Sequence, residues 1–456
     1  MILDEAIAYA HKEFELVQKE KGIPGIAFGL IHNGVLVYSS GVGERIIGGP
    51  APDADSIFRI ASMSKSFTAQ AILLLRDRGL LSLDDHITQY LPWTSTIGIP
   101  AGSAQISIRD VLTMGAGFPT DDPWGDRQEN LPLEQFDSLI AAGITFNRNV
   151  NTAFEYSNLG YALLGRIISE VSGVRYEDFM KNEIQIPQGM TRSSYFTEYV
   201  PEDVRAVGYV KFDAGLIEEP VTSTGAFTPM GGLHSSVREL TSWVAMFQAG
   251  KAEAQVPYRH IQSTLAKAQD DIVERIVTAS YGYGLFIEDD SELGRFVSHS
   301  GGYPGFGSHM RWHHESSWGI IALGNLTYAP MSVIGAKVMN QIVHLHMKEN
   351  PKKVVIAPRT IEAMKTVESL LEKWDDTLAD EWFAVNMDLD QPRNERRAAL
   401  EKILEGNLNI ERVESSVTSS TLSHAKWSVQ SGSKSIEIEM LMSPEKNPRI
   451  QKLVIK

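Results

Sequence analysis

The sequence predicts a mixed α/β (α+β) chain that is divided into two domains. Helical and strand-like segments are mixed along the first 350 residues, and the apolar pattern is then interrupted at Lys348–Pro358. Beyond this interruption, helices are followed by three or four alternating strands, an order typical of a small α+β domain. We therefore expect a large domain over residues 1–350 and a small C-terminal α+β domain over residues 358–456.

The first segments have clear helix and strand patterns. Met1–Glu20 has the pattern of an acidic amphipathic helix. Further on, Asn33-Gly34 lies between two apolar runs, and this dipeptide is typical of a tight hairpin turn. We therefore expect a helix followed by a pair of antiparallel strands.

A Ser-x-x-Lys motif, Ser62–Lys65, stands at the start of a predicted helix that extends to Arg78. The N–H of Ser62 would be free to face an anion there, and the amine of Lys65 would project beside the Ser62 hydroxyl. A serine is a poor nucleophile without a nearby base, and burial can lower the pKa of a lysine enough for that role. The alternative interpretation is that Ser62 only caps the helix and that Lys65 is a solvated surface lysine.

A Tyr-x-Asn motif, Tyr156–Asn158, directly precedes an apolar helix over Leu159–Val171. A tyrosine beside a lysine cation is expected to have a lowered pKa and to pass a proton. The amide of Asn158 can both donate and accept hydrogen bonds, which suits the binding of a substrate amide. Alternatively, Tyr156 packs at the helix entrance and Asn158 caps the helix.

A third motif, His299-Ser300-Gly301, lies in a segment with the pattern of a strand that ends in a glycine turn. Gly301 and Gly302 would let a substrate approach the backbone closely, and the Gly302 N–H could be an oxyanion donor. We interpret His299 as a proton-network and substrate-contact residue, not as the general base of a triad.

In this order, the three motifs resemble those of the serine β-lactamase-like hydrolases. This group includes class C β-lactamases, low-molecular-weight penicillin-binding proteins, D-Ala-D-Ala carboxypeptidases, D-aminopeptidases, D-amino-acid amidases and family VIII esterases (peptidase S12-like proteins). The resemblance covers roughly residues 5 to 345. Further segments that resemble the family are Ile23–Ala27, Gly34–Tyr38, Gly79–Asp85, Ile108–Thr113 and Gly231–Ser236.

The resemblance implies a β-lactamase/transpeptidase-like fold, with an antiparallel sheet flanked by helices and an all-helical subdomain. It also implies that Ser62 is the acylated nucleophile and that Lys65 and Tyr156 share the acid and base work. The substrate-binding and oxyanion residues would be Asn158, His299, Ser300, Gly301 and Gly302.

The resemblance implies a serine hydrolase that acts on small esters, amides or peptides, including those of D-amino acids. β-Lactamases of this type usually carry Lys-x-Gly where this chain has His299-Ser300-Gly301, which disfavours efficient β-lactam turnover. The alternatives are a penicillin-binding, D-Ala-D-Ala carboxypeptidase-like protein with slow or no turnover, and a weak β-lactamase.

The loop Pro119–Asp126 contains three aspartates and one tryptophan, and it is expected to edge the cleft. An acidic rim would attract a substrate with a free amino group and repel a carboxylate. The alternative is that these aspartates solvate a surface turn.

The composition is that of an ordinary globular protein, with 456 residues, a net charge of −15 and no cysteine. Because no basic cluster is present, nucleic acid and anionic membrane are not expected as partners. No cofactor and no metal are expected. The first residues lack a secretory signal, which favours the cytoplasm unless the sequence is a trimmed form.

The C-terminal domain is expected to be cystatin-like or NTF2-like. Three alternating apolar residues, Ala425, Trp427 and Val429, share one face of a predicted strand, and the next strand repeats the pattern. The expected role of this domain is packing, shaping of the cleft or dimerisation. The sequence leaves the oligomeric state open, and a homodimer is one of the alternatives.

Overall fold

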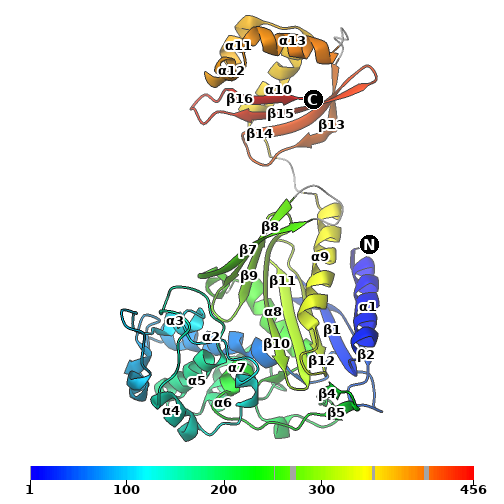
Figure 1. Cartoon of the computed structure of the whole chain (residues 1–456). Helices are drawn as coiled ribbons and strands as arrows, with labels where there is room; N and C mark the ends of the chain where they lie inside the picture. The colour runs from blue at the N-terminus through cyan, green and yellow to red at the C-terminus, as the bar shows by residue number, and fades with distance from the viewer. Residues whose placement is uncertain (1, 251, 268–273, 352–354, 405–409) are drawn as a thin grey trace. The chain divides into compact units, whose positions relative to one another are not determined.

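The computed structural model describes residues 2–250, 252–267, 274–351, 355–404 and 410–456. The chain forms two compact units, Met1–Glu349 and Asn350–Lys456 (Figure 1). Each unit has a hydrophobic core of its own.

An eight-stranded antiparallel sheet forms the centre of the first unit, in the order β2-β1-β12-β11-β10-β9-β8-β7. The hairpin between β1 and β2 turns at Asn33 and Gly34, which both have positive φ, as the sequence predicted. The strands are β1 (Gly25–His32), β2 (Val35–Gly43), β7 (Arg259–Lys267), β8 (Glu274–Tyr281), β9 (Phe286–Asp290), β10 (Gly294–Tyr303), β11 (Phe306–His313) and β12 (Trp318–Gly324). Two-residue strands β3 (Phe58–Arg59) and β6 (His234–Ser235) pair with each other, as do β4 (Tyr209–Phe212) and β5 (Gly215–Glu218).

Helices cover both faces of this sheet. Helices α1 (Ile2–Lys21) and α9 (Met331–Glu349) pack together, and their apolar side chains join those of β1 and β12 in one core. On the other face, α8 (Val237–Gln248) contacts β1, β2 and β12. The expected antiparallel sheet with flanking helices is therefore confirmed.

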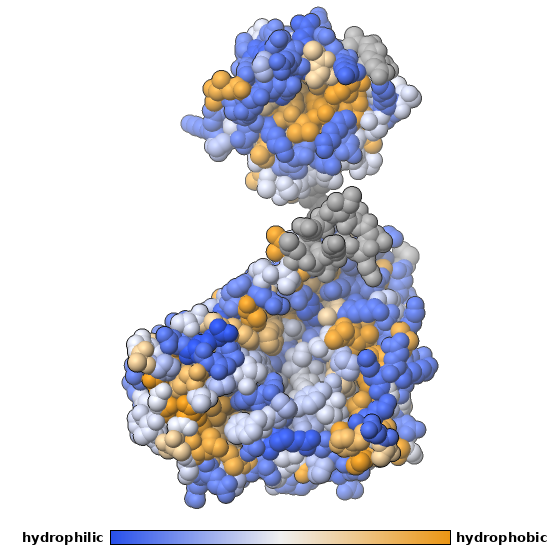
Figure 2. Space-filling view, viewed as in Figure 1, coloured by the Kyte–Doolittle hydropathy of each residue, from blue (hydrophilic) through white to orange (hydrophobic). Residues whose placement is uncertain are grey.

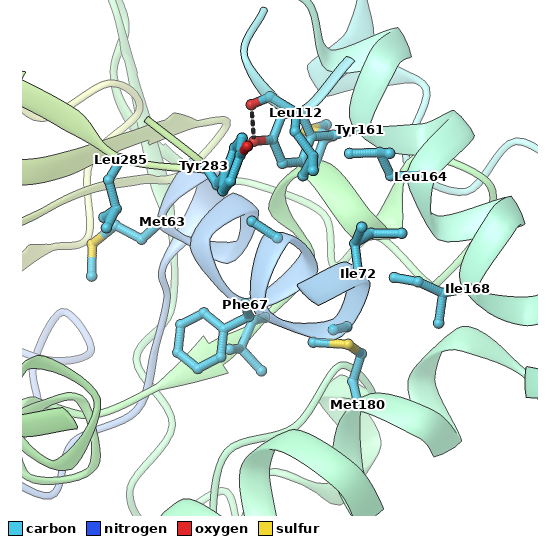
Figure 3. Close-up of a cluster of buried hydrophobic side chains, with 14 of the residues drawn as sticks. Met63, Phe67, Ile72, Leu112, Tyr161, Leu164, Ile168, Met180, Tyr283 and Leu285 are labelled. Carbon is cyan, nitrogen blue, oxygen red and sulfur yellow. Dashed lines mark hydrogen bonds between the residues drawn. The ribbon is translucent and has the colours of Figure 1, made fainter. Parts of the chain in front are cut away.

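A helical subdomain lies beside the sheet (Figure 1). Its centre is α2 (Ser64–Asp77), whose Ile72 is buried beside Leu164 and Ile168 of α5 (Asn158–Ser172) (Figure 3). Phe67 of α2 points to the other side of the helix and stacks on Trp243. Gly173, with a φ of +73°, ends α5 as the sequence predicted. The other helices are α3 (Ile108–Leu112), α4 (Leu133–Ala141), α6 (Tyr176–Phe179) and α7 (Thr228–Gly231).

The second unit is a four-stranded antiparallel sheet with helices packed on one face. The apolar residues of alternating positions, among them Trp427 and Ile438, face the helices. The strands run in the order β13 (Ile410–Thr418), β14 (His424–Ser431), β15 (Lys434–Met442) and β16 (Ile450–Ile455). The helices are α10 (Pro358–Glu372), α11 (Asp376–Trp382), α12 (Asn386–Asp390) and α13 (Arg393–Leu404).

One expectation about β10 is wrong. The strand does not end in a glycine turn at Gly301-Gly302, because both glycines stay paired with β11, opposite Ser308 and Gly307. The strand continues to Tyr303, and the chain turns only at Pro304 and Gly305. The third motif is thus part of a strand that stays paired with β11.

Within the described ranges, none of the helices combines the length and the apolar content that crossing a bilayer requires.

Candidate active site

Ser62 lies on a short 3₁₀ turn, Ala61–Met63, directly before α2. The preceding Ala61 has a φ of +47°, a left-handed conformation that is costly for a residue with a side chain. The neighbouring backbone is held in place, because the hydroxyl of Ser308 on β11 donates to the carbonyl of Ile60 over 2.6 Å. The strained turn and its anchor fix Ser62 at the entrance of the helix.

Lys65 is fully buried and makes three hydrogen bonds. Its Nζ lies 2.9 Å from Ser62 Oγ, 2.7 Å from Asn158 Oδ1 and 3.0 Å from the carbonyl oxygen of Met230. A neutral amine has only two hydrogens. Asn158 and Met230 offer the two acceptors that these hydrogens need, so the lone pair can face the Ser62 hydroxyl.

Burial lowers the pKa of Lys65 to about 8. The carboxylates of Asp122, Asp126 and Asp121 oppose this shift, because they favour the ammonium form. The result is a lysine that exchanges its proton near neutral pH, as a general base requires. The alternative of a solvated surface lysine is therefore wrong.

Tyr156 joins the same group. Its hydroxyl is hydrogen-bonded to Ser62, and its ring centre lies 4.9 Å from Lys65 Nζ. The expected lowering of its pKa is wrong, because burial and then Asp122 raise the pKa of Tyr156 well above its ordinary value. Tyr156 therefore holds its proton at neutral pH and acts as a hydrogen-bond donor or an acid.

Two neighbouring aspartates position Asn158 at the start of α5. Asp121 accepts from the backbone N–H groups of Asn158 and Leu159, each over 2.7 Å, and the side-chain amide of Asn158 donates to Asp122. Ser157 is the residue that caps the helix, since its Oγ accepts from Gly160. The alternative that Asn158 caps the helix is therefore wrong, and its carbonyl is left for Lys65.

The glycines of the third motif bring β10 against the nucleophile turn. A Cβ on Gly301 would lie 2.3 Å from the carbonyl oxygen of Ile60 and 2.8 Å from the Cβ of Ala61. A Cβ on Gly302 would lie 2.7 Å from the ring of Tyr328. The glycine at position 301 therefore allows the strand to approach the turn that carries Ser62.

His299 is buried and neutral. Its Nδ1 donates to the carbonyl of Ser300 over 2.6 Å, and its Nε2 accepts from the Tyr281 hydroxyl over 3.1 Å. Burial and the charge of Lys65 lower the pKa of His299 to about 3. This histidine therefore adds no positive charge to the site, in contrast to a lysine at the same place.

The motifs meet at a cavity of about 610 Å³. It is lined by Ser62, Asp122, Pro123, Asp126, Tyr156, Phe286, His299, Ser300, Gly302 and Tyr328. The loop over residues 119–126 thus edges the cavity as predicted, although Trp124 points elsewhere and packs on Phe227. Asp126 is only 2% exposed, and burial raises its pKa to about 6 although it accepts a 2.8 Å hydrogen bond from the Tyr328 hydroxyl.

Several participants carry no sequence motif. Met230 contributes only a backbone carbonyl, which any residue could supply. Phe286 and Tyr328 line the cavity from segments that resemble ordinary strand and loop sequence. The acidic loop was the one feature of these participants that could be recognised in the sequence, but the contact between Asp122 and Asn158 could not be predicted from it.

A second hollow of about 580 Å³ lies on the helical subdomain. It is bordered by Leu133, Val174 and Pro229, where apolar side chains gather on the surface over α4 to α6 (Figure 2). Its cationic side chains are already paired, Arg166 with Asp137 and Arg175 with Asp178.

Among the described residues, no group of three or more His, Asp or Glu side chains is arranged to hold a metal ion.

The sheet, the helical subdomain and the Ser-Lys-Tyr group define the class of penicillin-recognising and β-lactamase-like proteins. The chain belongs to the Beta-lactamase family, whose model matches residues 10–342. The resemblance seen in the sequence is therefore confirmed, and so is the β-lactamase/transpeptidase-like fold.

Individual proteins show the same relationship. Penicillin-binding protein 4* of Bacillus subtilis is 29% identical over 284 residues, which cover 59% of this chain and 61% of that protein. The octameric penicillin-binding protein homologue from Pyrococcus abyssi has a TM-score of 0.62 at 22% identity, over 99% of this chain and all of that one. EstCE1, described as a hydrolase with promiscuous acyltransferase activity, has a TM-score of 0.62 at 17% identity, over 75% of this chain and all of that one. The curated relative is matched over about three fifths of its length.

Proposed function

We propose that the protein is a serine hydrolase that works through an acyl-enzyme on Ser62. The observation that carries this proposal is the 2.9 Å contact between Ser62 Oγ and a fully buried Lys65 Nζ whose pKa is lowered to about 8. A serine next to such a base is an activated nucleophile.

In this reaction, Ser62 Oγ attacks the acyl carbon of an ester or amide while its proton passes to neutral Lys65. The backbone N–H groups of Ser62 and Gly302 stabilise the oxyanion of the tetrahedral intermediate. Tyr156 passes a proton to the leaving alcohol or amine and recovers it from Lys65. The Lys65 and Tyr156 pair then deprotonates a water molecule, which attacks the acyl-enzyme. The pair returns the proton to Ser62 Oγ, which restores the Ser62 hydroxyl.

The cavity favours small esters and amides without a carboxylate beside the scissile bond. Asp122 and Asp126 line it, and no arginine or lysine does among the described residues. His299, being neutral, supplies no cation in place of the lysine of the β-lactamase motif. Esters and amides of amino acids, D-amino acids included, match this charge, because their free amine is positive at neutral pH.

The direct test is labelling of the protein with a fluorophosphonate, followed by peptide mass spectrometry. We expect one adduct, on Ser62, together with sustained hydrolysis of p-nitrophenyl acetate. Ser62→Ala should lose both, whereas the control Ser423→Ala, in the surface Ser-x-x-Lys sequence of the second unit, should keep both. Labelling of Ser64 or Ser300 in place of Ser62 would disprove the assignment.

The second candidate function is a penicillin-binding, carboxypeptidase-like protein that is acylated slowly. A single burst without turnover on esters, with a stable adduct on Ser62, would favour it.

A comparison of D-alanine p-nitroanilide with its N-acetyl form tests whether the protein prefers substrates with a free amine. Equal kcat/KM for the two compounds would leave simple esterase activity as the better description.

We propose a homo-oligomer acting on small molecules, without nucleic acid or membrane partners. The Pyrococcus abyssi homologue, which is octameric, covers almost the entire chain, including the second unit. Light scattering coupled to size-exclusion chromatography would give the assembly directly, and a monomer would refute this part of the proposal. The net charge of −15 supports the expected absence of nucleic-acid partners.

A further inference from the structure

One buried histidine beside the cavity has no place in the reaction described above. His309 on β11 lies directly opposite Ser300 on β10, and its Nδ1 is 2.9 Å from Ser300 Oγ. It is 3% exposed, and its Nε2 has no hydrogen-bond partner among the described residues.

The chain is adapted to hold this ring. A Cβ on Gly335 of α9 would lie 2.5 Å from His309 Cδ2, so the helix has a glycine where the imidazole packs. Glycine inside a helix is less favourable than alanine. Both Gly335 and the unpaired Nε2 of His309 are unfavourable for the stability of the fold. The one side-chain hydrogen bond that the His309 ring makes among the described residues is the contact with Ser300.

The hydrogen-bond direction follows from the burial of Nε2. Burial, with Arg311 and His299 nearby, lowers the pKa of His309 to about 3, so the ring is neutral and has one N–H. A buried N–H without an acceptor is rarer and costlier than a buried lone pair without a donor. The hydrogen is therefore on Nδ1 and is donated to Ser300 Oγ.

This donation leaves the Ser300 hydroxyl hydrogen free to point elsewhere. Ser300 is half-buried and lines the cavity that also contains Ser62. We propose that His309 is a positioning residue, which turns the Ser300 O–H into the cavity as a donor to an acceptor oxygen of the substrate. The inference rests on the proposed hydrolase function.

The test is a double-mutant cycle on the full chain with a p-nitrophenyl ester. Ser300→Ala and His309→Leu should each raise KM about three- to tenfold with little change in kcat, as expected for loss of one uniform binding hydrogen bond. The double variant should be no worse than either single variant, because His309 acts through Ser300. Additive losses, or a folded His309→Leu with the KM of the wild type, would overturn the proposal.

His309→Asn is the matched control. Its amide N–H can take the position of Nδ1, so its KM should return toward the wild-type value while thermal unfolding confirms the fold. If His309→Leu does not fold, a folded His309→Asn with a KM as high as that of Ser300→Ala overturns the proposal. A wild-type protein that neither turns over esters nor labels on Ser62 would instead refute the hydrolase function itself.

Discussion

At the scale of single residues, the proton affinity of Lys65 results from two opposing effects. Burial favours the neutral amine, whereas three nearby aspartates favour the ammonium, and burial is the larger effect. In the proposed mechanism only the neutral form is a base. Activity should therefore be present above the pKa of Lys65 and be lost as the pH falls through it.

The first prediction concerns the pH profile. For the wild type, kcat/KM should rise with pH to a plateau, with a midpoint near the pKa of about 8. Asp122→Asn removes a charge that raises the pKa of Lys65 while it keeps an acceptor for Asn158, so the midpoint should move to lower pH. The control Asp213→Asn, on an exposed turn, should leave it unchanged. A midpoint that stays fixed in Asp122→Asn would contradict this electrostatic account.

The second prediction concerns Lys65 and Tyr156 as a pair. Lys65→Ala and Tyr156→Phe should each lower kcat by about a hundredfold or more, as is usual when a general acid or base is removed. The double variant should lose much less than the product of the two, because groups that act as a unit are not additive. Stopped-flow measurement of acylation with a p-nitrophenyl ester separates this step from deacylation. Full activity in Tyr156→Phe would exclude Tyr156 from proton transfer.

At the scale of elements, the site depends on how closely β10 approaches the turn before α2. Gly301 is in contact with both the Ile60 carbonyl and Ala61, the residue with positive φ. The strand and the turn therefore share one interface, and a displacement of the strand also displaces the proposed Gly302 donor.

The third prediction tests this interface. Gly301→Ala should lower kcat at least tenfold and destabilise the protein by about 1–3 kcal/mol, the usual cost of overpacking. Gly231→Ala is the control, because a Cβ there would approach the same Ala61 at an ordinary 3.6 Å. Urea unfolding and ester kinetics measure both effects. Wild-type kinetics in Gly301→Ala would show that the close approach is dispensable.

Elements with a strong local pattern could be predicted from the sequence, and the contacts between them could not. The apolar periodicity placed α2 and α5 within two residues of their observed ends. The end of β10 was misplaced because two glycines resemble a turn, whereas pairing with β11 keeps them extended. The Met230 carbonyl and the Tyr156 pKa depend on tertiary packing, which local sequence does not encode.

At the scale of the whole molecule, all residues that line the candidate site belong to the first unit. They come from segments between Ser62 and Tyr328, whereas the second unit begins at Asn350. Each unit has a hydrophobic core built from its own side chains.

The fourth prediction follows from this division. A chain that ends at Glu349 should fold and should keep kcat for p-nitrophenyl acetate within about threefold of the wild type, since no side chain of the described cavity is removed. Circular dichroism and ester kinetics are the measurements. A folded first unit without activity would assign a part in catalysis to the second unit.

Because β1 pairs with β12, a strand made early in synthesis has to wait for a strand that is made late. Gly25 donates its N–H to the side chain of Asn325, 300 positions further along the chain. At about 5–20 residues per second, a ribosome needs about 15–60 s to add those residues. During that time β1 has β2 as a partner on one edge, while its other edge and the apolar side chains that meet α9 lack their final cover. A newly made chain is therefore exposed to aggregation and to chaperone binding until β12 and then α9 have emerged.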